Sequence, residues 1–106
     1  MQPYPAEMSA TIGASEFDTA TTSPRRPGLP VYDLNVDAGW TVGPKPNGGY
    51  LLAALARAAA DEVVTDGADH PHPLAATAHF MRAPDPGPAE IAVQILRLGH
   101  GASQAR

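Results

Sequence analysis

The chain has 106 residues, enough for one small domain, and its 43% hydrophobic and 17% charged residues are typical of a globular protein. A formal net charge of −4, with only 7 Lys+Arg and no basic run, argues against nucleic-acid binding. The absence of cysteine excludes disulfides, thiolate metal sites and a cysteine nucleophile. There is no secretory signal pattern, and the longest apolar stretch, 50–60, is too short to span a membrane, so we expect a cytoplasmic protein.

The first thirty residues differ in composition from the rest of the chain. They are rich in Ser, Thr and Ala and contain Pro3, Pro5, Pro24, Pro27 and Pro30. Such a segment buries too little apolar surface to offset the entropy lost on ordering. We therefore expect 1–30 to be a flexible or irregular leader, with 1–15 disordered and 16–30 lying irregularly on the domain. The compact domain is expected at 31–106.

The domain begins with a strand-like pattern. Residues 31–36 alternate between apolar and polar side chains, which is the period of a half-buried strand. We expect a turn at 37–39 and a short second strand at 40–42. Two prolines and three glycines then predict a loop over 43–49.

A helix is predicted from Gly48 to about Val64. Asn47 is a good N-cap, because its side chain can accept hydrogen bonds from the free amides of the first turn. Apolar residues surround almost the whole circumference, interrupted only by Arg57, Asp61 and Glu62. Such a helix is expected to be enclosed by other structure.

The remainder of the chain predicts strands in hairpin connection. Alternation over 74–82 and 90–98 indicates two strands, and the proline-rich stretch 84–88 indicates a turn between them. Residues 102–106 look like the start of another strand. One antiparallel sheet wrapped around a central helix is the α+β hot-dog architecture, and it accounts for a helix that is apolar on every side.

Five short stretches resemble actinobacterial members of the acyl-CoA thioesterase II-like group, whose members contain two fused hot-dog domains. These stretches are 16–21, 39–43, 46–53, 78–83 and 87–91. They occur in the family's order and spacing and cover about residues 16–106. The resemblance implies an acyl-CoA substrate, hydrolysis by water attack and no cofactor. Family members are more than twice as long, so we expect the chain to hold the front part of the first hot-dog, incomplete at its C-terminus.

The resemblance also implies where the substrate binds. A hot-dog thioesterase is expected to hold the thioester carbonyl over the first turn of its central helix, which here is formed by Asn47, Gly48, Gly49 and Tyr50. The alternative is that this motif only caps the helix. His79 is predicted on the acyl-CoA groove or on an ordinary outer surface.

Two further side chains have a functional and a structural interpretation each. Arg82 is placed either against a CoA phosphate or in solvent, and the solvated position is favoured. Trp40 is placed either in an acyl pocket or, in preference, in the core.

No catalytic residue is assigned. In the better-known relatives the Asp, Thr and Gln that organise the attacking water belong to the second domain, and no residue here matches them. Asp61 and Glu62 lie more than three helical turns from the glycines, and Arg57–Asp61 is a plausible i,i+4 ion pair. We expect no metal site, since His70, His72 and His79 lack a recurrent ligand spacing.

The sequence is therefore compatible with two functions. In the first, the full-length protein hydrolyses an acyl-CoA thioester. In the second, this half is a non-catalytic hot-dog module that binds acyl-CoA or supports a partner domain. We expect it to associate with a second copy, most simply as a dimer, or with a second hot-dog domain. The 106-residue chain is expected to be inactive alone.

Overall fold

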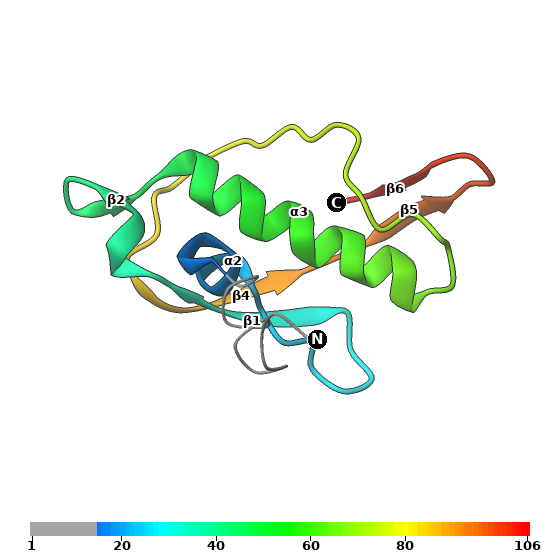
Figure 1. Cartoon of the computed structure of the whole chain (residues 1–106), viewed down its shortest axis with the longest axis horizontal. Helices are drawn as coiled ribbons and strands as arrows, with labels where there is room; N and C mark the ends of the chain where they lie inside the picture. The colour runs from blue at the N-terminus through cyan, green and yellow to red at the C-terminus, as the bar shows by residue number, and fades with distance from the viewer. Residues whose placement is uncertain (1–14) are drawn as a thin grey trace, which may run out of the picture.

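The computed structural model describes residues 15–106, and the part of the expected leader at 1–14 lies outside the described residues. The elements, in chain order, are α2 (Glu16–Thr21), β1 (Val31–Val36), the 3-10 turn η1 (Ala38–Trp40), β2 (Thr41–Val42), β3 (Lys45–Pro46), α3 (Gly48–Thr65), β4 (Gly87–Ala92), β5 (Ile95–Leu98) and β6 (Ser103–Ala105). The strands pair antiparallel as β1–β4, β2–β3 and β5–β6. Helix α3 lies across the β1–β4 ribbon, with α2 beside it (Figure 1).

Strand β1 confirms the alternation seen in the sequence. Tyr32, Leu34 and Val36 are buried against the helix layer, and the residues between them are exposed. In the β1–β4 register Asp33 is directly opposite Glu90, a pairing of like charges that is unfavourable across a sheet. Arg26 donates to both carboxylates at 2.6 Å and so offsets this repulsion.

Strand β4 begins earlier than the sequence indicated. It starts at Gly87, and Pro88 lies within it opposite Asn35, where we had expected a turn through 88 and a strand over 90–98. The ladder with β1 ends at Ala92, and β5 pairs instead with β6. Proline is tolerated in β4 because the strand pairs on one side only within 15–106. The strand expected to open near 102 is present as β6.

Helix α3 has the predicted start but not the predicted surroundings. Its fully buried positions Tyr50, Ala54, Ala58 and Glu62 recur every four residues and form one stripe facing the strands. Leu55, on another face, is 40% exposed. The prediction of a helix enclosed on all sides is therefore wrong for the described residues, which cover one face of it.

The segment between α3 and β4 differs most from expectation. Residues 74–82 were predicted as a strand, but the structure forms no strand there, and 69–86 make no backbone hydrogen bond within the described residues. Alternation alone does not make a strand, because the ladder needs a neighbouring chain segment to supply its partners. The predicted helix stop is confirmed, since α3 ends at Thr65 and Gly67 follows with φ +102°.

Two segments that were predicted to be irregular form regular structure. Residues 16–21, within the segment expected to be irregular, form helix α2, started by a reciprocal capping box between Ser15 and Asp18. The expected loop at 43–49 is partly a hairpin, in which Thr41 pairs with Pro46 and Val42 with Lys45. The turn expected at 37–39 is η1.

Candidate functional site

The N-terminus of α3 is capped by its own Asn47. The Oδ1 atom of Asn47 accepts from the amides of Gly49 at 2.7 Å and Tyr50 at 3.3 Å, and its carbonyl accepts from Leu51 at 3.1 Å. The amide of Gly48 donates to no acceptor within residues 15–106. The glycine corner, Asn47 to Tyr50, therefore presents one open donor at the positive end of an 18-residue helix, and two more that the Asn47 side chain occupies.

Phe80 lies over this corner. A Cβ on Gly48 would be 3.4–3.5 Å from the Phe80 ring, which is ordinary contact distance, so the ring packs against the bare Cα face of the glycine. Phe80 itself is 56% exposed. This contact places the segment after α3 next to the glycine corner, although the two are separated by about thirty residues of sequence.

Tyr50 is buried beneath the corner and links three elements. Its hydroxyl donates to the carbonyl of Ala20 at 2.9 Å and accepts from the amide of Asp37 at 3.0 Å. Trp40 stacks on the Tyr50 ring at 6.2 Å between centroids and meets Phe17 edge-on at 5.0 Å. Trp40 therefore packs against the core, as its favoured interpretation predicted, and Tyr50 fixes the first turn of α3 from inside.

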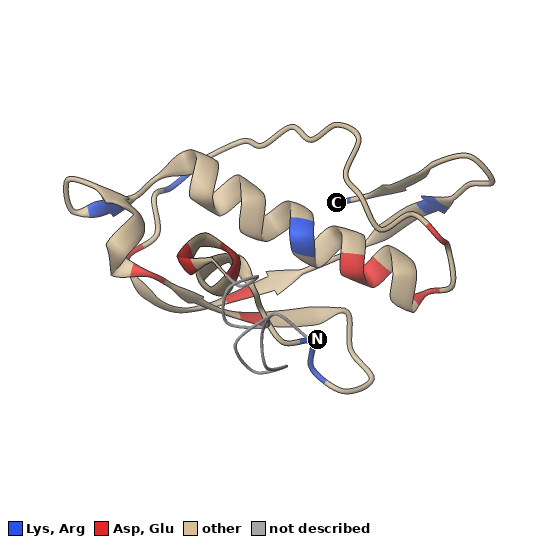
Figure 2. Ribbon diagram, in the orientation of Figure 1, with Lys and Arg blue, Asp and Glu red and all other residues tan. Residues whose placement is uncertain are grey.

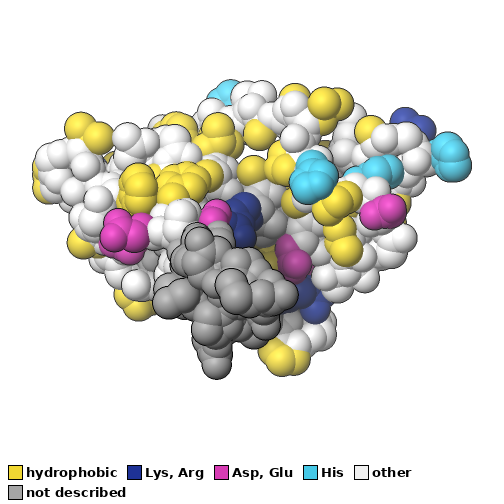
Figure 3. Space-filling model, viewed as in Figure 1, with side chains coloured by type: hydrophobic (Ala, Val, Ile, Leu, Met, Phe, Trp, Pro, Cys, Tyr) yellow, Lys and Arg dark blue, Asp and Glu magenta, His cyan; other side chains and the backbone are white. Residues whose placement is uncertain are grey.

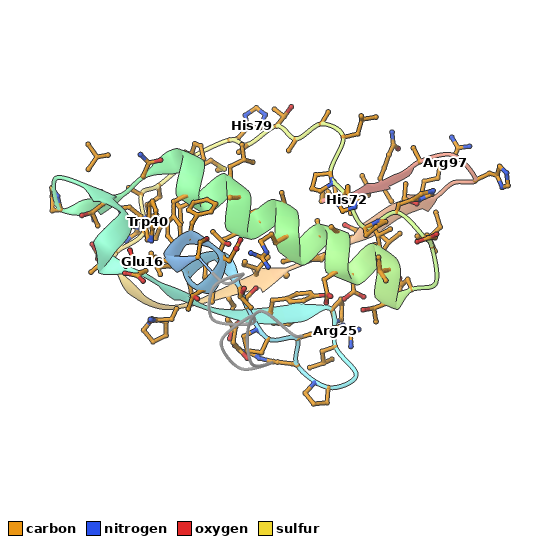
Figure 4. The ribbon with its side chains drawn as sticks, in the orientation of Figure 1. Glu16, Arg25, Trp40, His72, His79 and Arg97 are labelled. Atoms are coloured by element: carbon orange, nitrogen blue, oxygen red, sulfur yellow. The ribbon has the colours of Figure 1, made fainter. Side chains whose placement is uncertain are left out.

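His79 and Arg82 are not brought to the corner. Both are exposed, and neither makes a hydrogen bond or an ion pair with another described residue. Figure 4 shows His79 pointing away from α3. The histidines also remain apart, and residues 15–106 contain no group of three potential metal ligands.

The strongest electrostatic cluster was not predicted from the sequence. Arg25 donates to the two carboxylate oxygens of Glu62 at 2.8 and 3.3 Å, and the side chain of Glu62 is only 3% exposed. The Tyr32 hydroxyl donates to Asp61 at 2.7 Å and lies 3.2 Å from Glu62. Asp61 therefore bonds Tyr32 and not Arg57, so the predicted Arg57–Asp61 ion pair is wrong. Arg57 instead donates to the Asp18 carboxylate and to Thr21 Oγ1. Figure 2 shows the acidic residues of α2 in red and the basic residue of α3 in blue.

This cluster shifts the pKa values of its members. The hydrogen bonds from Arg25 hold the pKa of Glu62 below its usual 4.5, against the opposing effect of burial. Burial raises the pKa of Tyr32, and its hydrogen bond to Asp61 raises it further. Glu62 is thus held charged and Tyr32 neutral, so both are fixed in their states near neutral pH.

An open groove of about 500 Å³ adjoins the cluster. It is lined by Tyr32, Arg57 and Asp61 on one side and by Pro71, His72 and Pro73 on the other. The groove lies at the C-terminal half of α3, about 20 Å along the helix from the glycine corner at 1.5 Å per residue. Asp61 cannot act on a carbonyl bound at that corner.

No helix within 15–106 has the length and apolar character that a bilayer crossing requires.

Together, the capped helix and the antiparallel strands beneath it define an α+β domain of the hot-dog class. The family model described as the acyl-CoA thioesterase N-terminal domain matches residues 36–106, and the chain belongs to this family.

A solved structure agrees with this assignment, and curated relatives are similar to the chain in sequence. The crystal structure of a candidate thioesterase II from Thermobifida fusca matches with a TM-score of 0.63 and 37% identity, covering 79% of this chain and 29% of that one. Uncharacterized proteins of Mycobacterium tuberculosis and Mycobacterium bovis are 33% identical over 85 residues. The chain spans 29% of the length of these curated relatives.

Proposed function

We propose that this domain binds an acyl-CoA thioester at the glycine corner, and that the complete protein hydrolyses the thioester by water attack. The observation that carries the proposal is the Gly48 amide at the start of α3, which donates to no acceptor within residues 15–106 and lies beside the exposed Gly49. Membership of the acyl-CoA thioesterase N-terminal domain family supports this substrate.

The corner suits a thioester carbonyl. The carbonyl oxygen would accept from Gly48, and rotation of the Asn47 side chain would free the amides of Gly49 and Tyr50. As water adds to the carbonyl carbon, negative charge develops on that oxygen, and the amides and the helix dipole stabilise it more than they stabilise the neutral substrate. The C–S bond then breaks to give a carboxylate and the CoA thiol.

Two exposed side chains are candidates for contacts with the rest of the acyl-CoA ligand. Arg82 is the candidate for a CoA phosphate, because its guanidinium forks onto phosphate oxygens, and His79 is the candidate for the acyl-CoA groove. The proposal places 31–106 as the N-terminal part of a hot-dog domain. It also includes a cytoplasmic location and association with a second copy or a second hot-dog domain.

A non-catalytic acyl-CoA-binding module is the second candidate. Two observations favour it: Asn47 already occupies two of the corner's amides, and the helix carboxylates Asp61 and Glu62 lie far from the corner. In this version the corner holds the thioester without activating water.

Substitution of Asn47 by Asp tests the corner. Aspartate caps a helix as well as asparagine does, so the fold should be retained, but its carboxylate would repel the carbonyl oxygen and the developing oxyanion. Asn35→Asp is the matched control, because it adds the same charge at an exposed position of β1. Binding of a non-hydrolysable acyl-CoA analogue is measured by calorimetry, and release of CoA thiol by a colorimetric assay.

We expect at least a tenfold weaker affinity for Asn47→Asp and an unchanged affinity for Asn35→Asp. Unchanged affinity in a folded Asn47→Asp protein would refute the corner as the binding site. Binding without thiol release, in a protein of the full family length, would favour the non-catalytic module.

A further inference from the structure

The groove at the C-terminal half of α3 combines charged and apolar side chains. Its volume of about 500 Å³ lies in the range of sites that hold small organic ligands. Arg57 and Asp61 lie on the helix side of the groove, and 71–73 form the other side. Figure 4 places His72 over this part of α3, and Figure 3 shows basic, acidic and histidine side chains close together on this face, with apolar ones between them. Binding of a thioester carbonyl at the glycine corner makes no use of this groove.

Arg57 and Asp61 each have hydrogen-bonding atoms without a partner among the described residues. Every bond that Arg57 makes comes from Nη1, which donates to the carbonyl and carboxylate of Asp18 and to Thr21. Its Nε and Nη2 atoms bond no described residue, and together they form an edge with which a guanidinium binds phosphate oxygens. Asp61 accepts from Tyr32 through Oδ2, and its Oδ1 accepts from no described residue. The groove therefore offers donors for an anion and, one helical turn further on, an acceptor for a neutral donor.

A row of small residues connects this groove to the glycine corner. Gly49, Ala53, Ala56 and Ala60 recur at intervals of four, three and four residues, which places them along one side of α3. Gly49 is exposed and the three alanines are half-buried, and Ala60 lines the groove. The row is about 17 Å long at 1.5 Å per residue. An elongated ligand can therefore lie along α3 with one end at the corner and the other in the groove.

The pantetheine arm of coenzyme A has the length that this path requires. About 13 bonds join its sulfur atom to the first phosphorus atom, and an extended chain covers about 1.2 Å per bond, or about 16 Å in all. A thioester at the glycine corner with its arm along the row therefore brings the diphosphate to Arg57. The adenosine follows the diphosphate and reaches Asp61 and 71–73.

We propose that this groove binds the nucleotide end of the acyl-CoA, an inference that rests on the acyl-CoA binding proposed for the glycine corner. Arg57 binds the diphosphate through Nε and Nη2, Asp61 Oδ1 accepts from the adenine amino group, and the base packs against Pro71 and Pro73. The order of charges along α3 fits the ligand. The carboxylate of Asp61 would repel a phosphate, but it lies one turn beyond Arg57, where the base and not the diphosphate arrives.

Two other arrangements fit these observations less well. If the acyl chain lay along the row, its CH₂ groups would cover the unpaired edges of Arg57 and Asp61, and burying such groups without partners is costly. Arg82, the phosphate candidate considered above, follows Phe80 by two residues. Its Cα therefore lies within about 7 Å of the residue that covers the corner, less than half the length of the extended arm.

Three ligands separate the two ends of the substrate. A ketone analogue of acyl-CoA carries both ends, the corresponding acyl-pantetheine ketone carries only the corner end, and ADP carries only the nucleotide end. Binding of each to the 106-residue chain is measured by calorimetry, with circular dichroism as the check on folding. Arg57→Gln removes the guanidinium edge, and Ala60→Leu fills the groove without changing a charge. Arg97→Gln on exposed β5 is the matched control, and Arg82→Gln tests the other arginine.

We expect the acyl-CoA analogue to bind the parent chain at least about tenfold more tightly than the acyl-pantetheine analogue, because its nucleotide end adds a second contact. Arg57→Gln and Ala60→Leu should remove this gain and weaken ADP binding, whereas Arg97→Gln and Arg82→Gln should leave both unchanged. Arg57→Gln should not alter the affinity for the acyl-pantetheine analogue. Asn47→Asp should weaken the acyl-pantetheine analogue and leave ADP unchanged.

Three results would overturn the proposal. The first is a gain from the nucleotide end that is absent from the parent chain or persists in folded Arg57→Gln. The second is loss of that gain in Arg82→Gln and not in Arg57→Gln, which would place the nucleotide at the other end of α3. The third is an acyl-pantetheine affinity that rises with acyl length in the parent but not in Ala60→Leu, which would make the acyl chain the occupant of the row. In each case the effect of Asn47→Asp on the acyl-pantetheine analogue reports separately on the glycine corner, so failure of the groove is distinguished from failure of the proposed function.

Discussion

Arg25 and Glu62, 37 residues apart in sequence, form a bidentate ion pair, with Nε 2.8 Å from Oε1 and Nη2 3.3 Å from Oε2. Arg25 precedes β1 and Glu62 lies on the last turns of α3, so the ion pair connects the segment before β1 to the C-terminal end of α3. Because Glu62 is almost fully buried, its charge depends on its hydrogen-bond partners, chiefly this arginine and then the Tyr32 hydroxyl.

The lowered pKa of Glu62 predicts a loss of stability in acid. A carboxyl whose pKa is lower in the folded state contributes stability that is present above its unfolded value of 4.5 and is lost as the pH falls through the folded value. We expect Glu62→Gln to cost about 2 kcal/mol at pH 7 and to remove this part of the acid dependence. Urea unfolding at pH 7 and pH 3.5 measures both.

Glu90→Gln is the control for that experiment, because Glu90 also bonds an arginine but its side chain is 65% exposed. It should change the stability at pH 7 much less than Glu62→Gln does. Equal effects of the two substitutions would show that the buried pair contributes no more than a surface pair.

The raised pKa of Tyr32 predicts the opposite dependence at high pH. A group whose pKa is raised by folding contributes stability that is present below its unfolded value of 10.0 and is lost as the pH rises above it. Tyr32→Phe should cost about 1–2 kcal/mol near neutral pH, since it removes a hydrogen bond to the charged Asp61. The variant should also lose less stability than the parent between pH 9 and pH 11, as measured by urea midpoints. A parallel loss in both proteins would assign the alkaline transition to other groups.

Tyr50→Phe should be destabilising for a different reason. The Tyr50 hydroxyl is the partner of the Ala20 carbonyl and the Asp37 amide, and the ring around it is 2% exposed. Removing the oxygen leaves two backbone groups without their partner, which costs about 1–3 kcal/mol. Thermal unfolding measures the cost, and a change within error of zero would indicate that water replaces the hydroxyl.

The sequence predicts the parts of this fold that depend on local pattern. The alternation of β1 and the Asn47 cap depend on neighbouring residues, and both are confirmed. The capping box of α2 was also readable, from Ser15 and Asp18, but the surrounding prolines favoured an irregular segment.

Features that depend on distant partners could not be predicted in this way. The alternation over 74–82 is real, but a strand also requires a neighbour, and pattern does not supply one. The partner of Asp61 was assigned by helical spacing to Arg57, whereas the observed partner, Tyr32, comes from another element. Only part of the candidate site could be predicted from the sequence. The motif predicts the capped corner, whereas the Phe80 contact over Gly48 depends on the path of a segment without secondary structure.

Helix α2 is held to α3 by Tyr50 and Arg57, and the surroundings of these two side chains differ. Tyr50 bonds the Ala20 carbonyl from inside the core, whereas Arg57 bonds Asp18 and Thr21 from a position where its own side chain is 47% exposed. The Arg57 contacts exchange with water and are screened by salt, so Arg57→Ala should cost below about 1 kcal/mol of global stability.

Local opening of α2 should nevertheless respond. The six-residue helix has few internal hydrogen bonds of its own, so it depends on its attachment to α3, and losing one attachment should speed its exchange without unfolding the domain. We expect hydrogen exchange at the amides of Thr19 and Thr22 to accelerate about fivefold in Arg57→Ala, the equivalent of 1 kcal/mol, while α3 amides are unchanged. Arg97→Ala removes the same side chain from exposed β5 and is the control. Unaltered exchange in α2 would mean that Tyr50 alone holds it.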